Sequence, residues 1–103
     1  MTKKQAIQQA ILCIAEYFGI PPEHLADQRQ ARGVRMRNAA ASLTYYMHRG
    51  GYSYASISRF MGKGDDAIRK LESQGRLMMR GDHAAMIESL PKIPSTLEIT
   101  LTK

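Results

Sequence analysis

Glycine residues divide this chain into short segments, and the segments repeat apolar residues at helical spacing. In the first segment Ile7, Ile11, Ile14 and Phe18 follow one another at intervals of four, three and four residues, and Gly19 comes next. Such a stripe predicts an amphipathic helix that ends in a left-handed glycine cap. Comparable patterns predict helices over residues 3–18, 21–27, 37–49, 53–61 and 65–78, and a final short helix between Asp82 and Pro91.

Capping residues sharpen these boundaries. Thr2, Ser53, Asp65 and Asp82 each stand where a helix is expected to begin, and Ser, Thr and Asp side chains accept hydrogen bonds from the first free backbone N–H groups of a helix. Gly50-Gly51 and Gly62 are expected to end the third and fourth helices. Residues 28–36 are polar and rich in arginine, and they are predicted to form a loop.

Composition favours an all-α fold. The chain has 103 residues, of which 44% are apolar, enough for one modest core. Alanine and methionine are common and tryptophan is absent, a composition typical of closely packed helices. We therefore expect one small helical bundle over residues 1–90, followed by an extended tail over 91–103. In that tail Leu97, Ile99 and Leu101 alternate with polar residues, which is a strand period without a partner strand.

Positive charge is concentrated in the middle of the sequence. The formal net charge is +6, and residues 28–64 contain seven basic residues and no acidic one. These seven are Arg29, Arg32, Arg35, Arg37, Arg49, Arg59 and Lys63. Arginine forms planar bidentate contacts with phosphate and with guanine edges, so this window indicates a polyanion as partner.

Other features exclude several classes of protein. Cys13 is the single cysteine, and no stretch resembles a secretion signal or approaches the length of a membrane span. His24, His48 and His83 lack metal-ligand spacing, and no motif indicates an activated nucleophile or an acid–base pair. We expect a cytoplasmic protein that does not contact membranes, needs no metal or cofactor, and is not an enzyme.

The segment from Tyr54 onward has the spacing of a helix-turn-helix. Counted from Tyr54 as the first residue, that unit needs a small residue fifth, a turn residue ninth, and apolar residues at the fourth, eighth, fifteenth and eighteenth positions. The sequence supplies Ser58 as the small residue and Gly62 as the turn residue. The four apolar positions are occupied by Ile57, Met61, Ile68 and Leu71. An ordinary corner between two helices would share most of these matches.

A helix-turn-helix presents the start of its second helix to the major groove of DNA. The outward-facing candidates for that role are Lys63, Gly64, Asp65, Asp66, Arg69, Lys70 and Ser73. Arg69 and Lys70 can donate to guanine or neutralise phosphate. Asp66 is either a first-turn acid whose charge the helix dipole stabilises or an acceptor for a cytosine amine. Ser53, at a helix start, and the Tyr54 hydroxyl are candidate phosphate contacts.

The chain also resembles the C-terminal DNA-binding domain of the bacterial replication initiator DnaA. The resemblance covers about residues 7–80, and it rests on Ala-Glu-Tyr-Phe-Gly-Ile at 15–20, Leu25, the basic run at 28–34, Arg37-Asn38, and Tyr-Ser-Tyr-Ala-Ser-Ile at 52–57. In that family a basic loop places an arginine in the minor groove while the second helix of the motif reads the major groove. The resemblance therefore implies the loop role for Arg29, Arg32, Arg35 and Arg37 as a group.

The chain departs from that family at its base-reading signature. Where the family has a Gly-Gly-Arg-Asp-His-Thr-Thr-like run, this sequence has Gly-Lys-Gly-Asp-Asp-Ala at 62–67, one residue shorter and without the histidine or the threonines. The initiator's nucleotide-binding loop is absent from the chain as well. The resemblance thus implies the architecture of the domain but not the DNA sequence that it recognises.

From these observations we expect a double-stranded DNA-binding protein, a small nucleoid-associated regulator of transcription or replication of the kind that a phage or mobile element carries. The alternative is a helical protein-interaction module, such as a phage adaptor or inhibitor acting on a host replication or transcription protein. Binding of single strands by the tyrosines is a third interpretation. Residues 91–103 are the expected site of a homodimer or protein contact, unless this tail is unstructured.

Overall fold

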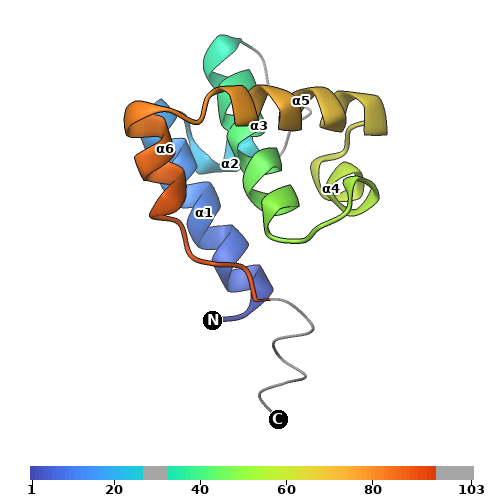
Figure 1. Cartoon of the computed structure of the whole chain (residues 1–103), viewed down its shortest axis with the longest axis horizontal. Coiled ribbons are helices and arrows are strands. Elements are labelled where there is room, and N and C mark those ends of the chain that lie inside the picture. The colour runs from blue at the N-terminus through green and yellow to red at the C-terminus, as the bar shows by residue number, and fades with distance from the viewer. Residues whose placement is uncertain (27–32, 95–103) are drawn as a thin grey trace.

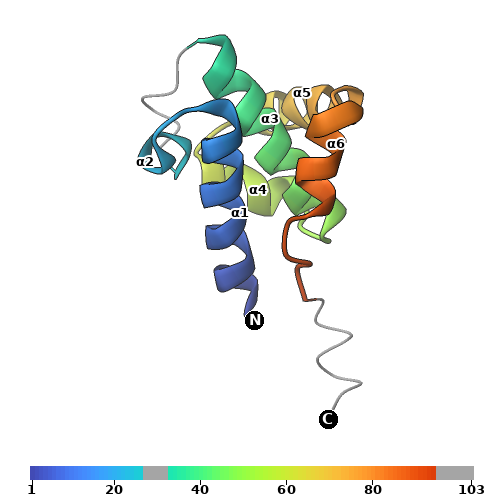
Figure 2. The same ribbon diagram turned by 90° about the vertical axis from the view of Figure 1, so that its left-hand side faces the viewer.

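The computed structural model describes residues 1–26 and 33–94, and the elements in these two stretches are all helices. The all-α expectation is confirmed for this part of the chain. In chain order the helices are α1 (Lys3–Phe18), α2 (Pro22–Ala26), α3 (Val34–Arg49), α4 (Tyr54–Met61), α5 (Asp65–Leu77) and α6 (Gly81–Glu88). Helix α3 is central and contacts α1, α2, α4 and α5, as Figures 1 and 2 show.

Both ends of α1 form as predicted. The Thr2 hydroxyl accepts a hydrogen bond from the Gln5 N–H (3.1 Å), and the Gln5 side chain accepts one from the Thr2 N–H (2.8 Å). This reciprocal pair is a capping box, which satisfies two backbone donors at the start of the helix. At the other end Gly19 adopts φ +68°, the left-handed cap that glycine tolerates without strain.

The start of α3 corrects the predicted loop. The loop was expected to continue to residue 36, but α3 begins at Val34, and Arg35 and Arg37 are therefore helical. The reason is Met36, which is buried and lies four residues before Ala40, so that it extends the apolar stripe of α3 by one turn. Because the side chains of Val34 and Arg35 are exposed, the sequence shows no clear apolar stripe over this turn.

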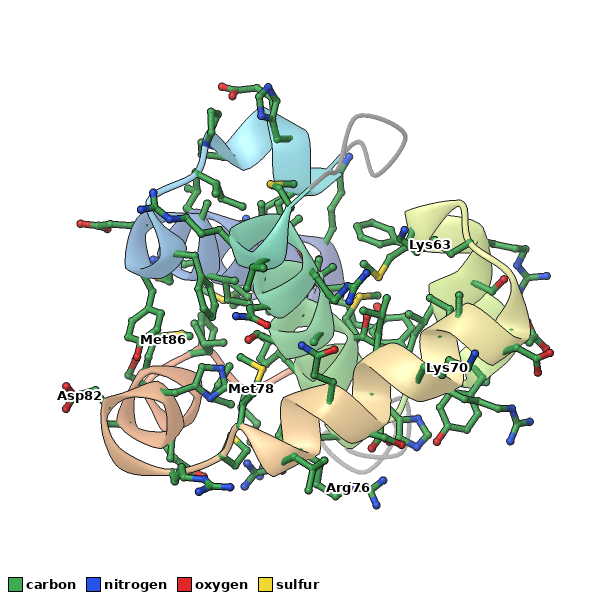
Figure 3. All side chains as sticks on the ribbon, turned by 90° about the horizontal axis from the view of Figure 1, so that it is seen from above. Lys63, Lys70, Arg76, Met78, Asp82 and Met86 are labelled. Carbon is green, nitrogen blue, oxygen red and sulfur yellow. The ribbon has the colours of Figure 1, made fainter. Side chains whose placement is uncertain are left out.

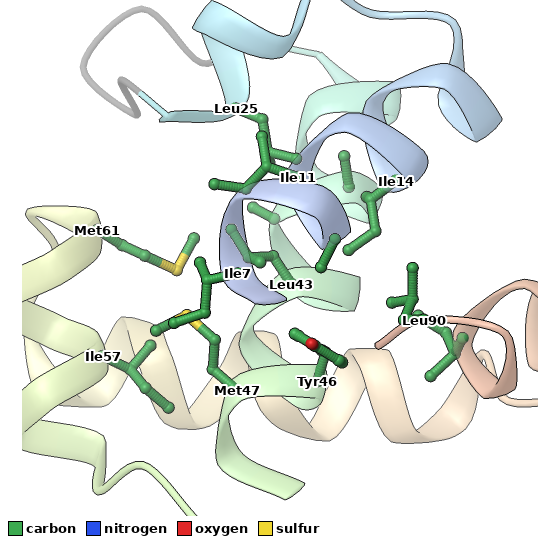
Figure 4. Close-up of a cluster of buried hydrophobic side chains, with 14 of the residues drawn as sticks. Ile7, Ile11, Ile14, Leu25, Leu43, Tyr46, Met47, Ile57, Met61 and Leu90 are labelled. Carbon is green, nitrogen blue, oxygen red and sulfur yellow. The ribbon is translucent and has the colours of Figure 1, made fainter. Parts of the chain in front are cut away.

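The main core lies between α1 and α3. Ile7, Ile11 and Ile14 of α1 belong to one cluster of buried side chains with Leu43 and Met47 of α3, and Figure 4 shows this cluster. Further side chains close this cluster at its edges: Leu25 from α2, Ile57 and Met61 from α4, and Leu90 from the segment after α6. Ala39 and Ala40 belong to the same cluster, and their small side chains let neighbouring helices approach α3 closely.

Gly75 marks the point where α5 crosses α3. A Cβ atom at this position would lie 2.7 Å from the Tyr45 Cβ and closer still to the Ala41 carbonyl oxygen. The two backbones therefore meet with no room for a side chain between them. One turn earlier in α3, the Asn38 side-chain oxygen accepts a hydrogen bond from the Gln74 amide (2.8 Å), which fixes the register of the crossing.

The last described segment packs back onto the bundle. Helix α6 begins at Gly81 with Arg80 as its N-cap, so the expectation that Asp82 caps it is wrong, and Asp82 lies in the first turn instead. After α6, Leu90 and Ile93 are buried, and Ile93 lies directly against Gly50. The alternating residues 97–102 of the predicted strand lie outside the described residues.

Candidate nucleic-acid interface

Helices α4 and α5 are joined by a tight turn over residues 62–64. Ser53 caps α4 by accepting a hydrogen bond from the Ser56 N–H (3.1 Å), as predicted. Gly62 adopts φ +68° after α4, also as predicted, and its N–H donates to the Ser58 carbonyl (2.9 Å). The Ser58 hydroxyl donates in turn to the Lys63 carbonyl. Main-chain and side-chain bonds from one residue therefore hold both sides of this turn.

The inward face of the helix pair has the expected apolar residues. Ile57 and Ile68 are fully buried, Met61 is 4% exposed, and Leu71 packs against the same cluster. The Met61 sulfur also lies 3.1 Å from the Thr44 hydroxyl, which ties α4 to α3. The predicted burial of the fourth, eighth and fifteenth positions is confirmed, and α4 and α5 pack as one unit against α3.

The outward face of α5 is exposed along its length. The side chains that face solvent there include Asp65, Asp66, Arg69, Lys70 and Ser73. Gly64 is exposed as well, and Lys63 is half-buried in the turn. Figure 3 shows Lys63 at the turn and Lys70 on α5. The structure therefore brings these seven predicted residues together, on the turn and on the adjoining face of one helix.

The N-cap of α5 differs from the expected one. Asp65 was predicted to cap the helix, but Gly64 occupies the cap position and makes no side-chain hydrogen bond, because it has no side chain. Asp65 and Asp66 are the first two residues of α5. At that position their negative charges are stabilised by the positive end of the helix dipole, which agrees with the first-turn interpretation of Asp66.

The described arginines of the basic window lie at different places in the fold. Arg29 and Arg32 lie outside the described residues. Arg35 extends toward Gly19 at the end of α1, and Arg37 is exposed in the first turn of α3. Arg49, at the far end of α3, pairs with Glu88 of α6 (3.1 Å), and this hydrogen bond raises the pKa of Arg49 further. Its charge is therefore partly neutralised by a residue far away in the sequence.

A stack of three side chains joins the end of α3, the start of α4 and the first half of α5. The His48 ring lies parallel to the Tyr54 ring, with centroids 4.3 Å apart and planes 15° apart. The Arg69 guanidinium carbon lies over the same tyrosine ring, 4.7 Å from its centroid. Sequence reasoning did not connect these three residues, because the helix-turn-helix spacing predicts no contact among them. They meet only because the turn at residues 62–64 folds α5 back toward the start of α4.

Helix α5 also contains an ion pair between a buried carboxylate and an exposed arginine, which sequence reasoning did not identify. The Glu72 carboxylate is 4% exposed, and both of its oxygens accept hydrogen bonds from Arg76 (2.6 and 2.7 Å). The contact raises the pKa of Arg76 above its ordinary value. The four-residue spacing of a glutamate before an arginine was the available signal. Arg76 is thus engaged with a protein carboxylate.

Ser42 and His83 form the one contact among the described residues that resembles a catalytic pair. The Ser42 hydroxyl lies 2.7 Å from the His83 Nε2, but Ser42 is fully buried and donates to the Asn38 carbonyl (2.9 Å). Burial lowers the pKa of His83 below its ordinary value, and its ring lies against Tyr17 and Phe18. A hydroxyl without solvent access cannot meet a substrate, so this contact is part of the packing between α3 and α6.

Within residues 1–26 and 33–94, no three His, Cys, Asp or Glu side chains gather as metal ligands. None of the helices described there has the length and apolar character that crossing a membrane requires. Comparison with known proteins found no matching family model, no similar curated protein and no similar solved structure.

Proposed function

We propose that this protein binds double-stranded DNA through a helix-turn-helix formed by α4 and α5, as a small regulator of transcription or replication. One observation supports this most: the pair buries Ile57, Met61 and Ile68 against the bundle while the opposite face of α5 is exposed. A second helix that is held by its inner face and open on its outer face suits insertion into the major groove. The resemblance to the DnaA domain agrees with this proposal.

Two groups of residues have different roles in this proposal. Residues on α5 (Asp65, Asp66, Arg69, Lys70 and Ser73) face base edges, and Lys63 and Gly64 approach them from the turn. Arg37 contacts the DNA backbone from the start of α3, together with Ser53 and Tyr54 at the start of α4. Arg29, Arg32 and Arg35 have the role that the resemblance implies, in phosphate or minor-groove contacts. Phosphate contacts fix orientation, whereas base contacts give specificity.

Selection of bound duplexes from a randomised pool at about 150 mM salt tests the proposal, because weak phosphate attraction is screened under this condition. Enrichment of one motif supports specific recognition, and the symmetry of the motif separates a monomer from a dimer. If about six phosphates are neutralised, log K falls against log salt with a slope of about −5. No enrichment, together with a slope near −1, would exclude the proposed function.

The two acidic residues at the start of α5 favour a second candidate, a protein-interaction module. Asp65 and Asp66 are both exposed at the end of the helix that would enter the groove, where phosphates would repel them. In this alternative the same surface binds a replication or transcription protein. Replacing both residues by Asn distinguishes the two functions. DNA affinity should rise or stay unchanged if α5 binds DNA, whereas a protein complex that depends on these carboxylates would dissociate.

A further inference from the structure

The stack on Tyr54 gives Arg69 a position that the other arginine of α5 does not have. Arg76 is bound by the Glu72 carboxylate, whereas no carboxylate in the described part of the chain forms an ion pair with Arg69. Asp65 and Asp66 precede Arg69 by four and three residues, yet neither pairs with it. Arg69 is also exposed, and no carboxylate in the described part of the chain pairs with its charge.

His48 holds the tyrosine that contacts Arg69. The His48 Nδ1 lies 3.1 Å from the Tyr52 carbonyl oxygen, and because a carbonyl can only accept, Nδ1 is the donor. This bond fixes the plane of the imidazole ring. Its acceptor lies two residues before Tyr54, the tyrosine on which the ring stacks. Tyr54 is also packed against the core cluster. The ring beneath Arg69 is consequently held by α3 and by the core.

Stacking restricts a guanidinium without using its hydrogen-bond donors. An arginine on an aromatic face keeps its N–H groups directed outward in one plane, whereas an unsupported surface arginine samples many rotamers. Two parallel N–H donors in a fixed plane match the O6 and N7 acceptors of guanine in the major groove. A lysine, such as the neighbouring Lys70, is a point charge that lacks this planar geometry.

We propose that Tyr54, held by His48, is a positioning residue that presents the Arg69 guanidinium to a guanine edge in the major groove. This inference rests on the proposed function and specifies it further: the recognised duplex contains a guanine whose O6 and N7 accept from Arg69. In this arrangement Tyr54 acts through Arg69, while Lys70 and Arg37 supply charge that does not depend on sequence.

The stack itself is tested on the protein without DNA. The Arg69 guanidinium carbon lies over the Tyr54 ring, so the NMR signals of the nearby Arg69 Hδ protons are expected upfield in the wild-type protein. The Tyr54→Phe variant should keep this shift, and Tyr54→Leu should lose it while retaining an apolar side chain for packing. Tyr17→Leu, at an exposed tyrosine of α1, is the matched control. Unshifted Arg69 protons in the wild-type protein would overturn the inference.

The role in recognition is tested with the duplex enriched by selection and with copies in which single guanines are replaced by 7-deazaguanine, which lacks the N7 acceptor. At one position the wild-type protein should lose affinity about tenfold, because a hydrogen bond to a charged donor is lost. Tyr54→Leu and Arg69→Ala should bind the unmodified duplex about tenfold more weakly, with no further loss on the modified one. Tyr54→Phe lacks the hydroxyl that is proposed to contact phosphate, so it should bind both duplexes more weakly by the same small factor and keep the full 7-deazaguanine effect.

Arg80→Ala is the control for loss of one positive charge at a site outside α4 and α5. Equal weakening of Tyr54→Leu on specific and unrelated duplexes, or an undiminished 7-deazaguanine effect in this variant, would overturn the positioning role while leaving DNA binding intact. Failure of the selection to enrich any duplex, together with a salt slope near −1, would instead overturn the proposed function itself, and the guanine contact with it. The two failures are therefore distinguishable.

Discussion

The Tyr46 hydroxyl donates a hydrogen bond to the Pro91 carbonyl, and through it α3 is tied to the segment that follows α6. The same hydroxyl lies 3.5 Å from the Ala6 carbonyl oxygen of α1. Tyr46 is 7% exposed, and burial raises the pKa of its phenol to about 12, with smaller contributions from Tyr52 and Cys13. One side chain thus joins three parts of the chain that are distant in sequence.

Tyr46→Phe should lower the free energy of unfolding by about 1–2 kcal/mol, because the half-buried Pro91 carbonyl loses its donor while the ring still packs. Urea denaturation measures this loss, and Tyr17→Phe at an exposed site is the control. In the wild-type protein, stability should also fall as the pH rises from 10 toward 12. Between these values the folded phenol keeps a proton that the unfolded one releases. A fall of equal size in Tyr46→Phe would contradict this assignment.

Gly75→Ala should destabilise the protein by about 1–3 kcal/mol, although alanine has the higher helix propensity. The added Cβ would meet the Ala41 carbonyl oxygen and the Tyr45 Cβ, and a backbone oxygen cannot turn aside as a flexible side chain can. Thermal or urea denaturation checks this. Ser73→Ala, two residues earlier on the exposed face, should change stability by less than about 0.5 kcal/mol. Wild-type stability of Gly75→Ala would show that α5 can move away from α3.

The burial of His83 predicts that the protein loses stability on mild acidification. Burial holds the pKa of His83 below its ordinary value of 6.5, so the unfolded state binds the proton more readily. The stabilising contribution is complete above 6.5 and declines as the pH falls toward the folded-state pKa. Urea denaturation at pH values from about 7.5 to about 5 should show this decline in wild type and in the His24→Gln control. The decline should be weaker in His83→Gln. Identical pH profiles for all three proteins would refute the assignment.

If the protein binds DNA as proposed, two arginines of α3 should affect that binding differently. Arg37 is exposed in the first turn, whereas Arg49 is held by Glu88. Arg37→Ala should weaken binding to all duplexes similarly and reduce the magnitude of the salt slope by about 1, as expected for one lost phosphate contact. Arg49→Ala should leave both quantities nearly unchanged. Binding titrations across a range of salt concentrations test the pair, and equal effects would mean that the Glu88 contact does not withhold Arg49 from DNA.

Local features of the fold were predictable from the sequence, because their causes lie within a few residues. Thr2 and Ser53 each accept a hydrogen bond from an N–H three residues later, and Gly62 adopts the backbone conformation that glycine alone adopts readily. Where two local solutions competed, the prediction failed. Gly64 could leave the N-cap to Asp65 or take it, and nothing within the turn distinguishes these choices.

The candidate interface was only partly predictable, because its geometry depends on contacts between distant residues. The outward face of α5 follows from helical periodicity alone. The stack of His48, Tyr54 and Arg69 requires the angle between α4 and α5, and the pairing of Arg49 with Glu88 requires the packing of α6. The charge of a window can be counted in the sequence, but the share of it that faces a partner depends on where every carboxylate lies in the fold.

The close crossing at Gly75 makes the first half of α5 a lever arm. Asp66 lies nine residues before the crossing, which is about 13 Å along the helix axis. A tilt of about 10° at the crossing would therefore displace Asp66 by about 2 Å, more than the tolerance of a hydrogen bond. Substitutions at the buried pivot are thus a route by which binding preference could drift in evolution while every exposed residue stays the same.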